Sequence, residues 1–485
     1  MFPSRDIPAL AIAALESDMR RRLPASLILI AVSATAADWP RFRSPNGSGV
    51  SSETALASIL SPEKARWRVT LPPGHSSPAI ADGHIYLTAF EKDDLLTIAL
   101  DAATGRVLWR RAAPRDRTEP LDKRNSPASP TPVTAANRVF VFFPDYGLLA
   151  YDSSGKQPWA TRLGPFNNMY GMGASPILTA GKVILVCDQS YGSFIAAFDQ
   201  DTGRERWRTP RPEAVSGHST PILYEPPGGG PAQIVAPGSF RMDAYSEETG
   251  ESVWWINGLA SEMKSVPVLA DGTLFINGYN MAENDPGRQV LMPPFEEVIA
   301  KHDANKDGKL SIGESPDERT KKYFPYVDAN HDGFLDAAEW RIYAASFAAV
   351  NSVMAIRPGG KGDRTAEAVA WKYHKAIPQL PSTLAYGGVL YMINDAGILT
   401  TFRAASGEVI QQARLGGTPD HYYASPVAAD GRVLFASQSG RVTLMKSGGR
   451  HEVIGSWDLD GEIYATPAIA GGRIYIRTPG SLYCW

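Results

Sequence analysis

A repeated hairpin is the feature that most constrains how this chain can fold. The stretch from Asp101 to Trp109 (Asp-Ala-Ala-Thr-Gly-Arg-Val-Leu-Trp) indicates the end of one strand, a tight turn at Thr104-Gly105 and a second strand with a large aromatic residue. Gly105 supplies the positive φ that a two-residue hairpin turn requires. Related copies run from Tyr151 to Trp159, from Asp199 to Trp207, from Ser246 to Trp254 and, with Ile in place of Trp, from Arg403 to Ile410. Their spacing of roughly 45 to 50 residues is that of a four-stranded propeller blade.

A second sequence marker, found at the start of the repeats, gives their number. Most repeats open with Ser or Thr before Pro, which suits the start of an innermost strand because Pro is confined to strand starts and edges. The eight openings are Ser77-Pro78, Ser129-Pro130, Ser175-Pro176, Thr220-Pro221, Val266-Pro267, Ser382-Thr383, Ser425-Pro426 and Thr466-Pro467. They predict an all-β fold, an eight-bladed β-propeller with four-stranded antiparallel blades. A strand near residues 64–70, which carries Trp67, is expected to complete the eighth blade and close the ring.

The first 36 residues are not expected to belong to this fold. Met19-Arg-Arg-Arg22 is a charged segment, Leu23 to Val32 is an apolar run too short to span a bilayer, and Ala34-Thr-Ala36 fits a small-x-small cleavage pattern. These signals predict a signal peptide that starts at Met19, with an amphipathic N-terminal helix as the alternative. The chain is then periplasmic or extracellular, and the lack of a Cys near the cleavage pattern argues against a lipid anchor.

Charge and cysteine content narrow the function classes. The net charge of −3 gives no support for nucleic-acid binding, which requires a concentrated basic face. The two cysteines, Cys187 and Cys484, lie in apolar strands of the third and eighth repeats. They are expected to be buried free thiols.

The fifth repeat is interrupted by an insertion of helical character. Its opening lies 115 residues before the next one, so that roughly 60 to 70 residues are added to a blade. Helical spacing of apolar residues appears within Phe295–Lys301 and Ala337–Phe347. We therefore divide the chain into a leader (1–36), a first propeller part (39–292), an insertion (293–349) and a second propeller part (350–485).

Two twelve-residue segments of the insertion match the EF-hand calcium loop. Side-chain and carbonyl oxygens at alternate places, Gly at the sixth place and Glu at the twelfth are what a bound Ca²⁺ requires. The first set of predicted ligands is Asp303, Asn305, Asp307, Lys309 through its carbonyl, Ser311 through water, and Glu314. The second set is Asp328, Asn330, Asp332, Phe334 through its carbonyl, Asp336 and Glu339. Two matches in succession predict two Ca²⁺ sites, with Leu310 and Leu335 at the place where neighbouring loops pair.

The spacing and charge of the two loops set further expectations. Residues 316–326 are too few for two independent helix–loop–helix units, so one connecting helix is expected to serve both loops. The first loop has three carboxylates and also carries Lys306 and Lys309, whereas the second has four carboxylates. The second loop is therefore expected to bind more tightly. Secreted EF-hand modules have Kd values on the order of 10⁻⁴–10⁻³ M.

Polar residues precede the inner strands and are expected to meet at one mouth of the propeller channel. They are His75, Asn125, Tyr170, His218, Lys264, His421, Tyr423 and Tyr464. His218, Lys264 and His421 are the weak catalytic candidates among them, because such groups can transfer protons near neutral pH. The alternative, which we favour, is that polar side chains simply line a wet channel.

The hairpin motif resembles the tryptophan-docking motif of pyrroloquinoline-quinone-like β-propeller repeat proteins. The resemblance covers roughly residues 39–292 and 350–485, and the segments 39–47 and 168–176 are similar to exported bacterial members. It implies the fold but not one function, since that family includes quinone-dependent dehydrogenases and an eight-bladed outer-membrane-protein assembly lipoprotein. The dehydrogenases characteristically have a vicinal Cys pair, which this chain lacks, and the assembly protein has a lipidation Cys and no EF-hand pair. Both specific roles are therefore in doubt.

The sequence favours a non-enzymatic, calcium-binding propeller that recognises a protein or glycan at one face. A monomer that does not span a membrane is expected, with Ca²⁺ as cofactor and no pyrroloquinoline quinone. The alternative is an enzyme at the channel mouth, either a quinone-dependent dehydrogenase or a lyase or hydrolase of polysaccharides.

Overall fold

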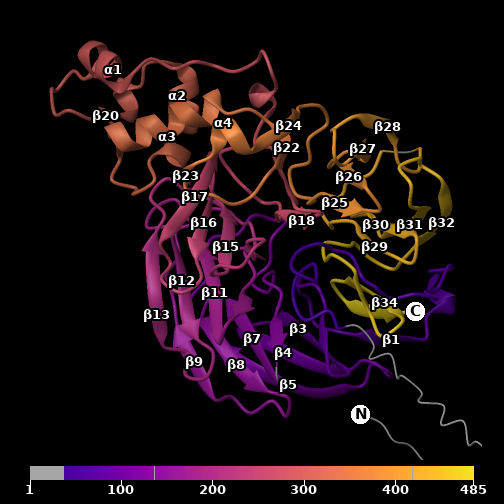
Figure 1. Cartoon of the computed structure of the whole chain (residues 1–485). Helices are drawn as coiled ribbons and strands as arrows, with labels where there is room; N and C mark the ends of the chain where they lie inside the picture. The colour runs from indigo at the N-terminus through magenta and orange to yellow at the C-terminus, as the bar shows by residue number, and fades with distance from the viewer. Residues whose placement is uncertain (1–37, 136, 418) are drawn as a thin grey trace, which may run out of the picture. The chain divides into compact units, whose positions relative to one another are not determined.

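The computed structural model describes residues 38–135, 137–417 and 419–485, so the predicted leader lies outside the described residues. Within them, eight sheets form the blades of a propeller, each with four antiparallel strands and one of them extended by a short fifth strand, and a small helical insertion lies at one side (Figure 1). The predicted fold class is confirmed. None of the helices in the described residues is both long and apolar enough to cross a membrane.

Each of the first four blades is built from consecutive strands, with the first strand innermost. Blade 1 contains β2 (Ala79–Ala81), β3 (His84–Glu91), β4 (Asp94–Asp101) and β5 (Val107–Pro114); blade 2 contains β6 (Val133–Ala135), β7 (Arg138–Phe143), β8 (Gly147–Asp152) and β9 (Trp159–Arg162); blade 3 contains β10 (Ile177–Thr179), β11 (Lys182–Cys187), β12 (Phe194–Asp199) and β13 (Glu205–Pro210); blade 4 contains β14 (Ile222–Tyr224), β15 (Gln233–Pro237), β16 (Arg241–Ser246) and β17 (Ser252–Asn257).

The remaining blades include the interrupted one and the one that closes the ring. Blade 5 contains β18 (Val268–Ala270), β19 (Thr273–Gly278), β22 (Ser352–Ile356) and β24 (Val369–Tyr373); blade 6 contains β25 (Leu384–Tyr386), β26 (Val389–Ile393), β27 (Ile398–Arg403) and β28 (Val409–Arg414); blade 7 contains β29 (Val427–Ala429), β30 (Arg432–Ala436), β31 (Arg441–Lys446) and β32 (Val453–Asp458); blade 8 contains β33 (Ala468–Ala470), β34 (Arg473–Thr478), β35 (Ser481–Cys484) and β1 (Trp67–Thr70). Strand β1 pairs with β35 from Trp67↔Cys484 to Thr70↔Ser481, and so the two ends of the ring share one blade.

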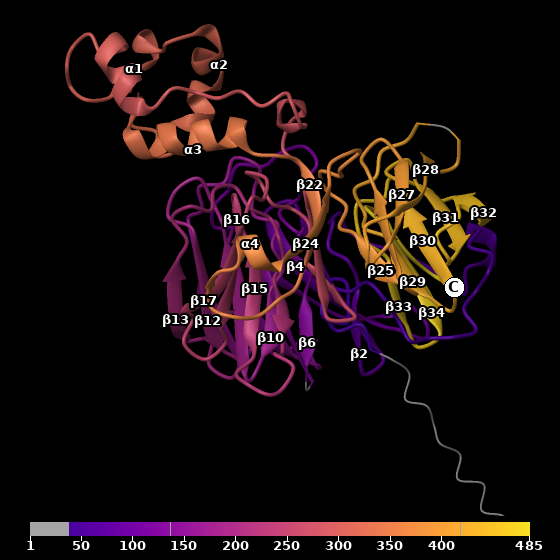
Figure 2. The same cartoon turned by 45° about the horizontal axis from the view of Figure 1, so that its top comes forward.

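The insertion leaves blade 5 after its second strand and returns at its third. It contains the helices α1 (Phe295–His302), α2 (Glu318–Val327) and α3 (Ala337–Ala348), the short strands β20 (Leu310–Ser311) and β21 (Phe334–Leu335), and the 3₁₀ turns η2 (Ala282–Asn284) and η3 (Ile312–Glu314). Outside it lie η1 (Pro62–Lys64), α4 (Thr365–Ala368) and β23 (Gly362–Asp363), which pairs with β17 in parallel. Figure 2 shows α1, α2 and α3 projecting beyond the strand ends. The insertion has its own apolar core, formed by Val298, Leu310, Phe324, Leu335, Trp340, Tyr343 and Phe347.

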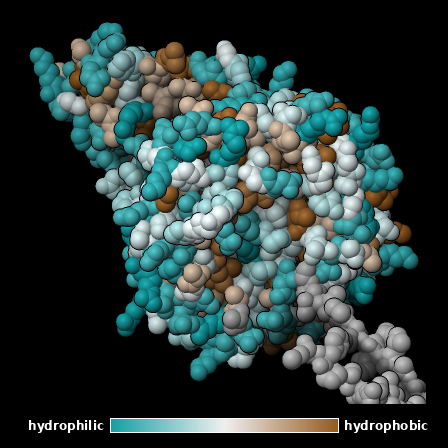
Figure 3. All heavy atoms as spheres, in the orientation of Figure 1, coloured by the Kyte–Doolittle hydropathy of each residue, from teal (hydrophilic) through white to brown (hydrophobic). Residues whose placement is uncertain are grey.

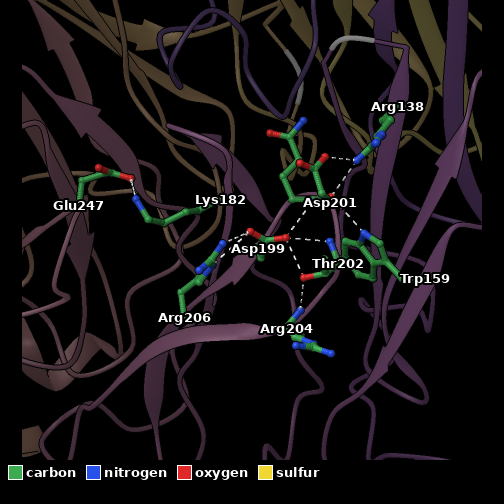
Figure 4. Close-up of polar contacts among 10 residues, drawn as sticks. Arg138, Trp159, Lys182, Asp199, Asp201, Thr202, Arg204, Arg206 and Glu247 are labelled. Carbon is green, nitrogen blue, oxygen red and sulfur yellow. Dashed lines mark hydrogen bonds and ion pairs between the residues drawn. The ribbon is translucent and has the colours of Figure 1, made fainter.

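The repeated hairpin joins neighbouring blades through its glycine and tryptophan. In blade 3, Asp199 accepts hydrogen bonds from the N–H and hydroxyl of Thr202 at 2.8 and 2.7 Å (Figure 4). Trp159, from the outer strand of blade 2, donates its indole N–H to the carbonyl of Gln200 at 3.0 Å. Its ring lies against Gly203, where an added Cβ would come within 2.5 Å of the indole. The glycine is therefore needed for the tryptophan dock as well as for its positive φ.

The same dock recurs around most of the ring. Gly105, Gly155, Gly250 and Gly407 face Trp67, Trp109, Trp207 and Trp371 of the preceding blade in the same way. Blade 5 offers no such turn to blade 4, since residues 357–368 join its last two strands. Trp254 of blade 4 instead donates to Gln233 of its own blade at 2.7 Å. The insertion thus coincides with a change in the blade contact beside it.

The Ser/Thr-Pro openings form a belt of hydrogen bonds between inner strands. The N–H of Ser77 donates to the hydroxyl of Thr131, and the N–H of Thr131 to that of Ser175, at 3.0 and 2.9 Å. Ser175, Ser382 and Ser425 continue the pattern toward their next neighbours. The prediction that Ser129-Pro130 opens blade 2 is therefore wrong. Thr131-Pro132 occupies that place, because β6 begins at Val133, directly after it.

A segment before β1 crosses the channel and ties distant blades together. Trp39 pairs with Ile80 of blade 1, and Val50 pairs in parallel with Ala428 of blade 7. Between them, the buried guanidinium of Arg43 donates to the carbonyls of Thr383 at 2.6 Å and Pro426 at 3.2 Å. Carbonyl oxygens of inner strands converge on the channel, and this segment supplies donors to several of them.

Candidate functional site

The two predicted calcium loops lie side by side at the helical insertion. The first loop connects α1 to α2, and the second connects α2 to α3, so that α2 serves both. Strand β20 pairs with β21, and Leu310 lies opposite Leu335. This confirms the expectation that these two leucines pair the loops.

The loop backbones have the same conformation at corresponding places. Lys306 and His331, at the fourth place, have φ values of 62° and 58°, and Gly308 and Gly333, at the sixth, have 81° and 85°. A Cβ added at either glycine would meet no other atom within 4 Å. The positive φ alone therefore explains glycine at the sixth place.

The carboxylates of the first loop accept hydrogen bonds from the backbone of the same loop. Asp303 accepts from the N–H of Gly308 at 2.9 Å, and Asp307 accepts from that of Lys309 at 2.9 Å. Glu314 uses one carboxylate oxygen for the N–H of Ala304 at 3.0 Å and the other for the Ser311 N–H and hydroxyl. These bonds lower the pKa of Glu314, with the Ser311 hydroxyl as the largest contribution.

The second loop repeats this pattern place for place. Asp328 accepts from the N–H of Gly333 at 3.0 Å, and Asp332 accepts from that of Phe334 at 2.9 Å. Glu339 again spans its loop, accepting from Ala329 at 2.9 Å and Asp336 at 3.0 Å. Its burial raises the pKa of Glu339, unlike that of Glu314. The buried carboxylate therefore has more to gain from a neighbouring cation.

The donor chemistry of both loops fits a hard cation. Each loop presents carboxylate, amide and backbone carbonyl oxygens, which are the ligands that Ca²⁺ takes, together with a Glu at the twelfth place. As the side chains stand, the described residues contain no cluster of three His, Cys, Asp or Glu that could hold a metal. The carboxylates are engaged with backbone N–H groups, as described above.

One ion pair links the two loops. The ammonium group of Lys309, at the seventh place of the first loop, lies 2.8 Å from a carboxylate oxygen of Asp332, at the fifth place of the second. The positive charge that the sequence assigned to the first loop thus also faces a predicted ligand of the second.

At the channel mouth, two of the three catalytic candidates meet. His218 and Lys264 both line two adjoining cavities of about 190 and 180 Å³. Asn125 and Tyr170 line the first of these, and the second is lined by His75, Tyr423 and Tyr464. His421 lines neither cavity and is exposed. It therefore does not join His218 in either cavity; its ring instead stacks beside that of Tyr423, with the centroids 6.4 Å apart.

The charges at the mouth are paired, and burial disfavours the charged form of the two imidazoles that line it, those of His75 and His218. Lys264 contacts Glu262 at 2.9 Å, and Arg124 contacts Asp122 at 2.7 Å. Burial, followed by the charge of Lys264, lowers the pKa of His218 to about 3. A general base is most effective with a pKa near the working pH. His218 is therefore poorly suited to proton transfer at neutral pH.

The sequence did not lead us to expect that the segment ahead of the first repeat lines the second cavity. Phe42, from the channel-crossing segment, lines the second cavity together with inner-strand hydroxyls such as Ser175 and Thr220. The clue was the cluster of Trp39, Arg41 and Arg43 ahead of the first repeat, whose polar and aromatic side chains had no place in a blade.

Both cysteines are free and buried, as the sequence predicted. Cys187 lies on β11 and Cys484 on β35, in blades 3 and 8. Burial raises the pKa of Cys484 to about 11 and also raises that of Cys187. Neither thiol has the lowered pKa and the exposure that a nucleophilic cysteine requires.

Comparison with the sequence patterns of known protein families shows which family the chain belongs to. The sequence pattern of the family described as outer membrane protein assembly factor BamB matches residues 56–192, 191–291 and 336–485. The chain belongs to this family. The BamB-family match omits residues 292–335, which hold the first loop and α2. None of the curated protein sequences compared with the chain matches it.

Solved structures agree on the fold. BamB from Moraxella catarrhalis is 13% identical, with a TM-score of 0.52 over 87% of this chain and 99% of that one. A europium-containing methanol dehydrogenase is 9% identical, with a TM-score of 0.59 over 92% and 97%. The quinohemoprotein alcohol dehydrogenase ADHIIG from Pseudomonas putida HK5 is 13% identical, with a TM-score of 0.53 over 92% and 80%. This BamB-family chain thus shares one propeller architecture with an assembly factor and with dehydrogenases, and fold alone does not separate their functions.

Proposed function

We propose that this chain is an exported recognition or scaffold propeller whose insertion binds two Ca²⁺ ions. The observation that carries the proposal is the repetition of one loop conformation and one hydrogen-bond pattern in two loops paired through β20 and β21. Asp303 and Asp328 begin loops of identical length, and Glu314 and Glu339 end them. A solvated acidic turn has no need for such a match, whereas a pair of calcium loops requires it.

The remaining features favour recognition over catalysis. The leader predicted before residue 37 supports export, and the family description supports a protein partner. A monomeric ring with a rigid face suits a protein or glycan partner. The low pKa of His218 and the separate, buried cysteines give no support to a quinone-dependent dehydrogenase, lyase or hydrolase. An absorption scan after adding pyrroloquinoline quinone and calcium should show only the sum of the components.

Calorimetric calcium titration tests the proposal. The wild-type chain should bind two Ca²⁺ ions with Kd values on the order of 10⁻⁴–10⁻³ M. Glu339→Gln should lose or strongly weaken one of them, because an amide cannot supply the bidentate anionic clamp. Glu318→Gln serves as the control, since this exposed residue begins α2 outside both loops. Absence of calcium binding by the wild-type chain, or equal affinity in Glu339→Gln, would refute the assignment.

The face of the molecule drawn in Figure 3 is mainly hydrophilic, and its apolar residues lie in small separate groups. Large apolar side chains that are exposed include Ile59, Leu291, Ile312 and Tyr326. Of these, Tyr326 belongs to the cavity described next.

A further inference from the structure

A cavity of about 440 Å³ lies between the insertion and the propeller loops. Helices α2 and α3 contribute Tyr323, Tyr326, Tyr343 and Phe347 to one wall, and the propeller contributes Tyr170 to the other. Its volume lies within the range of roughly 300–1,000 Å³ that is usual for small-molecule sites. Tyr326 and Tyr323 are the more exposed of these rings, whereas Tyr343 and Phe347 are largely buried in the core of the insertion. An exposed tyrosine offers a flat apolar face with a polar edge.

Three residues that line this cavity, Ser216, Ser261 and Tyr343, have a hydroxyl group without a hydrogen-bond partner in the described residues. Ser216 and Ser261 line it and are 6% and 2% exposed, and neither hydroxyl makes a hydrogen bond within the described residues. Burying an unpaired hydroxyl costs free energy, so such groups call for an explanation. Their loops are held in place: the N–H of Val215 donates to Ser239 at 2.8 Å, and that of His218 donates to the carbonyl of Met263 at 2.8 Å. Both hydroxyl oxygens are buried, so each serine side chain would have to rotate to reach a ligand in the cavity.

The charges around the cavity favour a neutral ligand. Glu262 is paired with Lys264 at 2.9 Å, and both carboxylate oxygens of Glu339 accept backbone N–H groups. Lys322 is the cationic lining residue, and it lies on the exposed side of α2. A strongly acidic ligand would meet two carboxylates here, and a strongly basic one would meet acids that are already engaged.

We propose that this cavity binds a neutral oligosaccharide. The apolar C–H face of a sugar ring matches the tyrosine walls, and its hydroxyls can pair with those of Ser216 and Ser261. The cavity adjoins the channel cavity at Tyr170 and Glu262, which line both, so there is room for more than one sugar unit. This proposal rests on the proposed function and names the partner class.

Calcium and sugar binding are coupled through the second loop. Ala329 and Glu339 of that loop line the cavity, and Asn167 of the propeller donates to the Ala329 carbonyl at 2.9 Å. A bound Ca²⁺ would fix the loop that forms this wall. Calcium is therefore expected to increase sugar affinity, and by linkage the sugar to increase calcium affinity at the second loop by the same factor.

Calorimetry with maltotriose, cellotriose and chitotriose, each with and without millimolar calcium, tests the site. At least one of these neutral sugars should bind. Tyr326→Ala and Ser261→Ala should weaken binding about tenfold or more, whereas Tyr191→Ala, a tyrosine that is 70% exposed and outside the cavity, should not. Ser261→Ala should not lower the melting temperature, since that hydroxyl has no partner to lose. Replacing a residue that only supported the fold would instead lower the melting temperature and leave the affinity for the sugar unchanged.

Three results would overturn the proposal. The first is that none of the three sugars binds, and the second is that Tyr326→Ala and Ser261→Ala bind as well as the wild type. The third is that an acidic trisaccharide, trigalacturonate, binds more tightly than every neutral one. The coupling fails separately if Glu339→Gln, with its calcium site lost, binds sugar as tightly as the wild type in calcium. Calcium titration without sugar distinguishes all of these from failure of the calcium assignment itself.

Discussion

Substitution of Gly203 by Ala would test the tryptophan dock that joins blades 2 and 3. The added Cβ would lie 2.5 Å from Trp159 Cε3 and 2.7 Å from its Cδ2, with φ at +69°. Gly181 is a matched control in the same blade, because its φ is +75° but nothing lies within 4 Å of an added Cβ. The two variants share the backbone cost and differ only in the clash.

The expected magnitudes follow from these contacts. Left-handed backbone at a non-glycine residue costs about 1–2 kcal/mol, which is the whole cost expected for Gly181→Ala. Gly203→Ala also displaces the indole, which costs about 1 kcal/mol for its hydrogen bond to Gln200 and about 1–3 kcal/mol for repacking. The difference between the variants is therefore about 2–4 kcal/mol. With an unfolding entropy of about 2.1 cal/mol/K per residue over roughly 450 residues, this corresponds to about 2–4 °C in Tm.

Thermal melts followed by circular dichroism measure this difference, and a double-mutant cycle assigns its cause. In a Trp159→Leu background, most of the excess cost of Gly203→Ala over Gly181→Ala should disappear, because the clashing ring is gone and only the contact of the added Cβ with Thr161 Oγ1 at 2.8 Å remains. Equal melting temperatures for the two single variants would refute the reasoning. So would a Gly203→Ala cost that Trp159→Leu leaves unchanged.

Three other perturbations have outcomes set by local contacts. Hydrogen bonds led by the Thr202 hydroxyl lower the pKa of Asp199 from 3.8 to about 2, so its carboxylate contributes stability above about pH 4 that is lost as the pH falls toward 2. Asp199→Asn should reduce this acid sensitivity in melts across that window, and an unchanged pH slope would contradict it. Arg43→Met should lower the unfolding free energy by about 3 kcal/mol in urea titrations, because it leaves buried carbonyls without hydrogen-bond donors. A loss below about 1 kcal/mol would count against the role of the channel-crossing segment. Deleting residues 293–349 should leave a folded propeller by circular dichroism, and a chelator added to the full chain should reduce only the helical signal; joint loss of the β signal would show that calcium stabilises the whole ring.

The blade count and the loop pairing were predictable because they depend on local rules. A positive φ needs glycine, a strand start accepts proline, and a calcium loop needs oxygens at fixed places, so Gly105, Ser77-Pro78 and Asp303 each indicate their own structure. The error at Ser129-Pro130 has the same origin. Two consecutive Ser/Thr-Pro pairs satisfy the local rule equally, and only the register of β6 selects Thr131-Pro132.

The sites that depend on several blades could not be predicted in this way. His218 and Lys264 line the same two cavities and His421 lines neither, and this depends on how loops of different blades pack at the channel mouth. The role of Arg43 depends on carbonyls contributed by blades 6 and 7, more than 300 residues away in the chain.

By itself, the sequence determined the fold class, the number of blades, the place of the insertion and the two oxygen-rich loops. Each of these follows from residues a few positions apart, whose preferences act within one turn or one strand. Only the tertiary structure decided what fills the channel, how the insertion lies against the propeller, and that Ser216 and Ser261, with their unpaired hydroxyls, line the same cavity as the tyrosines. These features arise where segments distant in sequence meet, and the packing of a closed ring, rather than any local preference, brings them together.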